Sequence, residues 1–131
     1  MEKRLKENVA LFLLGGLLYY HIEVLWRGFS HISMIFCGGF CFLSVGKIAS
    51  MLKDKISMIG QMILGAISIT GIELLTGVVV NLWLHLNVWD YSDVPGNFLG
   101  QICLKYSVFW FFLSAPCIKV YNWIEENVFS V

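Results

Sequence analysis

A single acidic residue, Glu73, lies near the middle of a long apolar stretch, residues 59–86, and is the strongest indication of a functional site in this sequence. A carboxylate at the depth of a bilayer costs roughly 3 kcal/mol on insertion scales unless it is paired or faces a polar cavity. Three further charged residues, Glu23, Arg27 and Lys105, fall inside or at the edge of other apolar segments. The four charges sum to zero, which predicts a polar interior built between helices.

Transmembrane helices must position these residues. Of the 131 residues, 58% are hydrophobic, and the mean hydropathy is +0.75, which is too apolar for a soluble protein of this length. A span needs about 20 mainly apolar residues. We therefore expect an all-α integral membrane protein with one domain over residues 1–131, an antiparallel bundle of four transmembrane helices joined by short loops. The expected spans are residues 9–26, 32–50, 59–86 and 98–121.

Lysine and arginine predict the orientation of these spans. Loops rich in these residues stay in the cytoplasm, so we expect both termini and the loop at 51–57 to be cytoplasmic. The turn at 27–31 and the loop at 89–97 are expected to face outward. Seven of the nine Lys and Arg residues would then share the inner side: Lys3, Arg4, Lys6, Lys47, Lys53, Lys55 and Lys119.

Composition also excludes some functions. The net charge is zero, which argues against binding of nucleic acid. The sequence contains no GxxxxGK[ST] loop, so the chain itself lacks this means of binding ATP. Its four cysteines form no CxxC pair and show no metal spacing, so we predict no metal site; the sequence identifies no cofactor.

Two helices carry most of the candidate ligand-binding residues. In the first, Tyr20, Glu23 and Arg27 share one face because they are spaced by three and four residues. Glu23 and Arg27 can form an i,i+4 ion pair, and the short turn after them brings His31 close. In the third, Glu73 and Asn81 lie on a stripe that runs toward the outer surface. The alternative to a ligand-binding role is structural: Glu73 could form an ion pair with Lys105 or Arg27 that only fixes the registry of the helices.

The loop at 89–97 and the start of the fourth span complete the candidate site. Asp90, Tyr91 and Asn97 lie in a polar, aromatic loop that could close over a cleft or could equally be a well-ordered connector. Gln101 and Lys105 would lie in the first turns of a helix that begins near residue 98, with Lys105 about two turns deep. The tail at 120–131 mixes apolar residues with two glutamates and predicts a short interfacial helix.

Several motifs resemble a family of small bacterial membrane proteins. They are Tyr20-x-x-Glu23, Arg27-Gly28-x-Ser30-His31-x-Ser33-Met34, Gly38-Gly39, Glu73-Leu74-x-Thr76-Gly77 with Asn81, Trp89-Asp90-Tyr91-Ser92 and Asn97-x-x-Gly100-Gln101-Ile102-Cys103, followed by Ser107 and Trp110. The family is the ABC-transporter type IV, or CmpB-like, family, and the resemblance spans about residues 15–115. Ser30 stands where many relatives have Thr, and Lys47 stands near a common Asn. The resemblance implies a multi-pass protein of the bacterial cytoplasmic membrane and a permease component of a transporter.

Three functions remain open from the sequence. The first is binding or permeation of a small polar solute or lipid head group at an outward-facing cleft, with a homodimer or a partner membrane subunit completing a path. We expect the glycine-rich faces of helices two and three to supply those contacts. The second is a membrane-embedded enzyme that uses Glu23, Glu73 and a histidine. The third is a structural accessory subunit whose buried charges set registry only.

Overall fold

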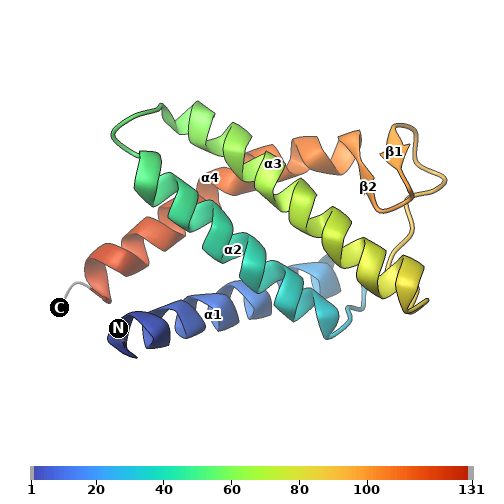
Figure 1. Cartoon of the computed structure of the whole chain (residues 1–131), viewed down its shortest axis with the longest axis horizontal. Helices are drawn as coiled ribbons and strands as arrows, with labels where there is room; N and C mark the ends of the chain where they lie inside the picture. The colour runs from blue at the N-terminus through green and yellow to red at the C-terminus, as the bar shows by residue number, and fades with distance from the viewer. Residues whose placement is uncertain (1, 130–131) are drawn as a thin grey trace.

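Four long helices form the body of the molecule in a computed structural model that describes residues 2–129 (Figure 1). The helices are α1 (Glu2–Arg27), α2 (Ser33–Leu52), α3 (Met58–Gly77) and α4 (Leu104–Asn127). The start of α1 and the end of α4 lie at the same end of the molecule, and the segment between α3 and α4 lies at the other (Figure 1). A pair of two-residue strands, β1 (Asn97–Phe98) and β2 (Ile102–Cys103), is the one addition to the predicted all-helical fold among the described residues.

Three helical segments are long and apolar enough to cross a membrane, which makes this a membrane protein. They cover Glu2–Arg27, Ser33–Leu52 and Met58–Trp83. The fourth helix has 24 residues, or about 36 Å at 1.5 Å per residue, which is long enough to cross a membrane. Within residues 2–129, however, it is not one of the three segments that are also apolar enough. Its crossing of the membrane therefore stays a prediction.

Several predicted boundaries are wrong. The first helix begins at Glu2 rather than near residue 9. The third changes to a π-helix, η1 (Val78–Trp83), and stops there rather than at residue 86. His85 and Asn87 then adopt positive φ angles of 55° and 52°, which right-handed helices do not contain. Hydropathy measures how apolar a segment is and says nothing of its backbone conformation, so it extended the span too far.

The fourth helix also differs from its prediction. It begins at Leu104, because residues 97–103 turn back on themselves as the β1–β2 hairpin instead of entering the helix. Lys105 is therefore in the first turn and exposed, not two turns deep. At the other end α4 continues to Asn127 without a break, so no separate interfacial helix forms over the described part of the tail. Residues 130 and 131 lie outside the described residues.

Glycines let the helices approach closely, as the sequence predicts for helix two. A Cβ added to Gly38 would lie 2.6 Å from the Cβ of Tyr19 on α1, and one added to Gly65 would lie 2.6 Å from the Oγ of Ser114 on α4. Small residues at such contacts are typical of helix packing in membranes. Gly38 and Gly65 therefore face helices of the same chain, whereas nothing lies within 4 Å of a Cβ added to Gly71 on α3. Contacts of the glycine-rich faces with a second subunit stay a prediction.

Candidate functional site

Glu73 is buried between helices, with 5% of its surface exposed. Its Oε1 accepts a 3.2 Å hydrogen bond from the indole nitrogen of Trp110 on α4. Its Oε2 accepts a 2.9 Å hydrogen bond from the hydroxyl of Tyr91. Both donors are neutral, and within residues 2–129 Glu73 belongs to no ion pair. The registry alternative that pairs it with Lys105 or Arg27 is therefore wrong.

The loop after η1 brings Tyr91 to this carboxylate. The backbone nitrogen of Tyr91 donates a 2.7 Å hydrogen bond to the carbonyl of Gly100, which ties the loop to the β1–β2 turn. The Tyr91 ring stacks on that of Tyr106 in α4, with centroids 5.1 Å apart and planes at 16°. The two contacts fix the ring so that its hydroxyl points at Glu73.

The predicted ion pair between Glu23 and Arg27 is present. Arg27 Nε lies 3.1 Å from Glu23 Oε2, and both side chains are largely buried. The guanidinium also donates a 2.9 Å hydrogen bond to the carbonyl of Val88 and lies 4.5 Å from the centroid of the Phe29 ring. Arg27 thus joins the end of α1 to the loop that carries Tyr91.

A cleft of about 350 Å³ lies among these groups and brings five predicted site residues together. Its polar and charged lining consists of Glu23, Arg27, Glu73, Asp90 and Tyr91. Its aromatic lining consists of Tyr19, Trp26, Trp89, Tyr106, Phe109 and Trp110. Three carboxylates thus share the cleft with one guanidinium, and that guanidinium is already paired with Glu23.

Asn81 and Gln101 support the cleft from outside its lining. Asn81 Oδ1 accepts a 2.6 Å hydrogen bond from the backbone nitrogen of Val88, and its Nδ2 donates a 2.8 Å bond to Gln101 Oε1. The carbonyl of Gln101 accepts a 2.9 Å hydrogen bond from the indole nitrogen of Trp89. These bonds hold the first residues of the loop against η1.

Asn97 and Asp90 organise the loop itself. Asn97 Nδ2 donates to the carbonyl of Val94 at 2.9 Å, and its Oδ1 accepts from the nitrogen of Gly100 at 3.0 Å. Asp90 Oδ1 accepts a 2.9 Å hydrogen bond from the backbone nitrogen of Ser92, and this bond holds the pKa of Asp90 below its ordinary value. Asp90 therefore has a fixed geometry although it is exposed.

Besides Asn81, Asn97 and Gln101, three further predicted site residues lie outside the cleft lining. Tyr20 is half-buried with its ring against that of His21. His31 Nδ1 lies 2.8 Å from the Oγ of Ser33 at the start of α2, so the ring is engaged with the turn. Lys105 is exposed, with its Nζ 5.7 Å from the centroid of the Tyr106 ring.

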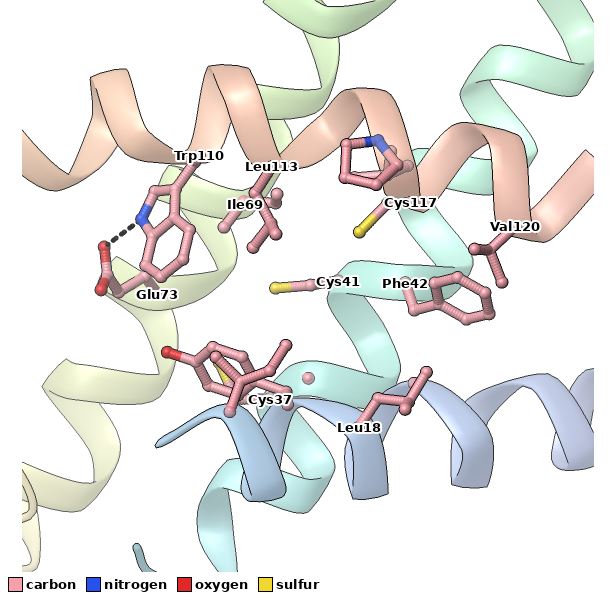
Figure 2. A pocket seen from close by; sticks show the side chains of 16 residues that line it. Leu18, Cys37, Cys41, Phe42, Ile69, Glu73, Trp110, Leu113, Cys117 and Val120 are labelled. Carbon is pink, nitrogen blue, oxygen red and sulfur yellow. Dashed lines mark hydrogen bonds between the residues drawn. The ribbon is translucent and has the colours of Figure 1, made fainter. Parts of the chain in front are cut away.

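Sequence reasoning missed a second hollow, an apolar pocket of about 190 Å³ bounded by all four helices (Figure 2). Its walls include Leu18, Phe42, Leu113, Cys117 and Val120. Figure 2 shows Glu73 and Trp110 at one end, joined by their hydrogen bond, and the sulfur atoms of Cys41 and Cys117 pointing into the space. A hollow of this kind arises where side chains are too small to fill the interior, and no chemical motif marks it.

Comparison with known proteins places the chain in a family. No solved structure matches it significantly. A family model described as "Putative ABC-transporter type IV" (ABC_trans_CmpB) matches residues 10–131. The match covers nearly the whole chain, including every helix that lines the cleft and the loop that carries Tyr91. The chain therefore belongs to the "Putative ABC-transporter type IV" family, the one that its sequence motifs resemble.

Proposed function

We propose that this protein recognises the positively charged group of a small polar solute or lipid head group in the cleft, as a membrane component of a transporter. Membership of the family and three membrane-spanning helices make it a membrane protein related to transport. The finer assignment, a ligand site at Glu73 serving a permease with a partner subunit, is our proposal. It places the cleft on the outer side and both termini in the cytoplasm, following the lysine and arginine distribution.

The single observation that carries this proposal is the set of partners of Glu73. A carboxylate inside a membrane is stable as an anion only where a cation or several donors compensate its charge. Glu73 has two neutral donors, Tyr91 and Trp110, and belongs to no ion pair among residues 2–129. It lines a cleft in which acids outnumber bases. A ligand cation would supply the missing counter-charge.

A stability measurement tests the proposal. Purified protein in phosphatidylglycerol nanodiscs is heated with ethylammonium or ethanolamine, with acetate as the anionic comparison. A ligand at a hundred times its Kd should stabilise the folded state by about 2.7 kcal/mol. We expect stabilisation by the ammonium compounds and none by acetate.

The control variant is Glu73→Gln, which keeps the shape and can still accept from Trp110 while donating to the oxygen of Tyr91. We expect it to fold and to lose stabilisation by ammonium. Equal stabilisation of both proteins would show that the cation binds elsewhere and would overturn the proposal. Absence of any ammonium effect on the wild-type protein would do the same and would leave a structural role for the buried acid.

A further inference from the structure

We propose that the cleft continues into a binding pocket for an alkyl chain, so that the ligand is a membrane amphiphile with an ammonium head. This inference rests on the function proposed above and adds the chemical class of the ligand. The head would lie at Glu73, and the chain would occupy the apolar pocket of Figure 2.

The pocket has the size and lining that an alkyl chain requires. Its volume is about 190 Å³, and its walls are almost entirely apolar. An engineered cavity of about 150 Å³ with such walls stays dry and binds benzene. A larger apolar hollow among membrane helices can therefore hold several methylene groups, which gain dispersion contacts there that an empty space would forfeit.

The pocket and the polar cleft adjoin at Glu73. The same five residues line both: Tyr19, Ile22, Cys37, Glu73 and Trp110. The carboxylate thus stands at the junction between an acidic, aromatic vestibule and an apolar interior. A ligand that contacts both must be polar at one end and apolar at the other, which is the chemistry of an amphiphile.

The pocket also opens sideways, between α1 and α4. Leu18 and Ile22 on α1 and Val120 on α4 line it, yet they are 46%, 42% and 41% exposed, so they form its rim. The two helices are bridged beyond the rim on either side. Trp26 and Phe109 meet with centroids 6.3 Å apart toward one end, and Arg4 lies 3.7 Å from Glu125 at the other. Because α1 is a membrane span, the rim faces lipid, and a chain can enter from the bilayer.

The charge balance selects the head group. Glu23, Glu73 and Asp90 line the cleft with Arg27, whose charge Glu23 already balances. Two carboxylates remain for the ligand. An anionic head would meet them as like charges, whereas an ammonium head would donate hydrogen bonds to Glu73 and balance its charge.

The test compares alkylammonium ions of two, four, six and eight carbons on the protein in phosphatidylglycerol nanodiscs. Affinity should rise about threefold to fourfold per added methylene, as for full burial of each group, until the pocket is full. Partition into the bilayer also rises with chain length, so a pocket-filled variant, Cys117→Phe, is measured in parallel. Val108→Phe adds the same ring to an exposed position of α4 that does not line the pocket.

Each outcome separates the two proposals. We expect Cys117→Phe to bind ethylammonium with the affinity of the wild type but to lose the rise in affinity with chain length, while Val108→Phe keeps that rise. The same rise in Cys117→Phe as in the wild type would overturn the proposal that the pocket binds the chain, and would leave recognition of the head group intact. Ethylammonium binding that survives Glu73→Gln would instead overturn the proposed function.

A second measurement does not depend on tolerance of the added ring. A variant with Cys117 as its only cysteine should be alkylated more slowly by N-ethylmaleimide when octylammonium is bound. A reporter cysteine at Phe112, which is exposed on α4 and outside the pocket, should not be protected. Protection by phosphatidylethanolamine would identify a bilayer lipid as the source, and protection by octylammonium alone a single-chain amine. Equal rates for Cys117 with and without both compounds would overturn the inference.

Discussion

The hydroxyl of Tyr91 donates a 2.9 Å hydrogen bond to Oε2 of Glu73, so the loop after α3 closes directly on the buried acid of that helix. Further hydrogen bonds attach the loop: Arg27 donates to the carbonyl of Val88, Asn81 accepts from the nitrogen of Val88, and Trp89 donates to the carbonyl of Gln101. The state of the carboxylate and the position of the loop are therefore coupled. A ligand cation that replaces Tyr91 as a partner of Glu73 would act on the loop as well.

The bond between Tyr91 and Glu73 predicts an energetic coupling between the two side chains. Tyr91→Phe leaves a buried carboxylate oxygen without its donor and should lower the free energy of unfolding by about 1–3 kcal/mol. In the Glu73→Gln background the same change removes a weaker, neutral bond and should cost less. Unfolding of the four proteins of this cycle in mixed SDS micelles should give a coupling energy of at least about 0.5 kcal/mol.

Tyr106→Phe is the matched control for this cycle. Tyr106 stacks on Tyr91 but is not a hydrogen-bond partner of Glu73. Its cycle with Glu73→Gln should be additive. If Tyr91→Phe proved equally additive, the loop would be independent of the acid, and closure of the loop could not be part of the site.

Asn81 predicts a local effect at the start of the loop. Asn81→Leu keeps a similar volume but removes the acceptor of the Val88 nitrogen and the donor to Gln101. A lost buried bond of about 1–3 kcal/mol corresponds to amide hydrogen exchange about 5- to 150-fold faster. Exchange measured by mass spectrometry should rise over residues 88–91 and remain unchanged in α1. Leu84→Ala, a change at an exposed residue of the same segment with a negative φ angle, should leave both rates alone.

Two glycines predict opposite responses to the same substitution. A Cβ at Gly16 would clash with the backbone carbonyl of Ile35, whereas nothing lies within 4 Å of a Cβ at Gly71. Gly16→Ala should separate α1 from α2 and destabilise the protein by about 1–3 kcal/mol. Gly71→Ala should stabilise α3 by up to about 1 kcal/mol, because Ala loses less backbone freedom on folding. Thermal unfolding of the two variants in one detergent checks both, and a tolerant Gly16→Ala would contradict the close approach of these helices.

The fold was predictable as far as hydropathy reaches. Apolar segments of about 20 residues identify spans, and three of the four expected spans meet that criterion in the structure. Hydropathy could not show that residues 84–86 leave the helix, since Leu84 and Leu86 are apolar and one histidine between them does not end an apolar segment. It also could not show that Phe98 pairs in a short hairpin rather than beginning α4. Backbone conformation at these points depends on contacts with distant residues.

The site was predictable where burial has a chemical cost. A carboxylate inside a span must have partners, so Glu73 is recognisable as a site residue from the sequence. Its partners are 18 and 37 residues away in the sequence, and periodicity along one helix gives no information about such distances. The apolar pocket was harder to predict, because it depends on which interior residues are small, such as Cys41 and Cys117. Residues of this kind are usually interpreted as helix-packing residues, so nothing in the sequence marks a pocket beside them.

The remaining prediction concerns α4 and the orientation of the chain. Among residues 2–129, α4 is not one of the helices that meet the length and hydropathy criteria for a span. It nevertheless packs along α2 and α3, and its C-terminal end lies beside the start of α1, where Arg4 lies 3.7 Å from Glu125. A helix that returns to the starting end must cross the same thickness as its neighbours. We therefore expect four crossings, with Asp93 outside and Asn127 inside. In intact bacteria a membrane-impermeant maleimide should label Asp93→Cys at once in a protein without other cysteines, and should label Asn127→Cys only after the membrane is permeabilised. Labelling of both from outside would show that α4 does not cross, and the reverse pattern would invert the orientation and place the cleft on the cytoplasmic side.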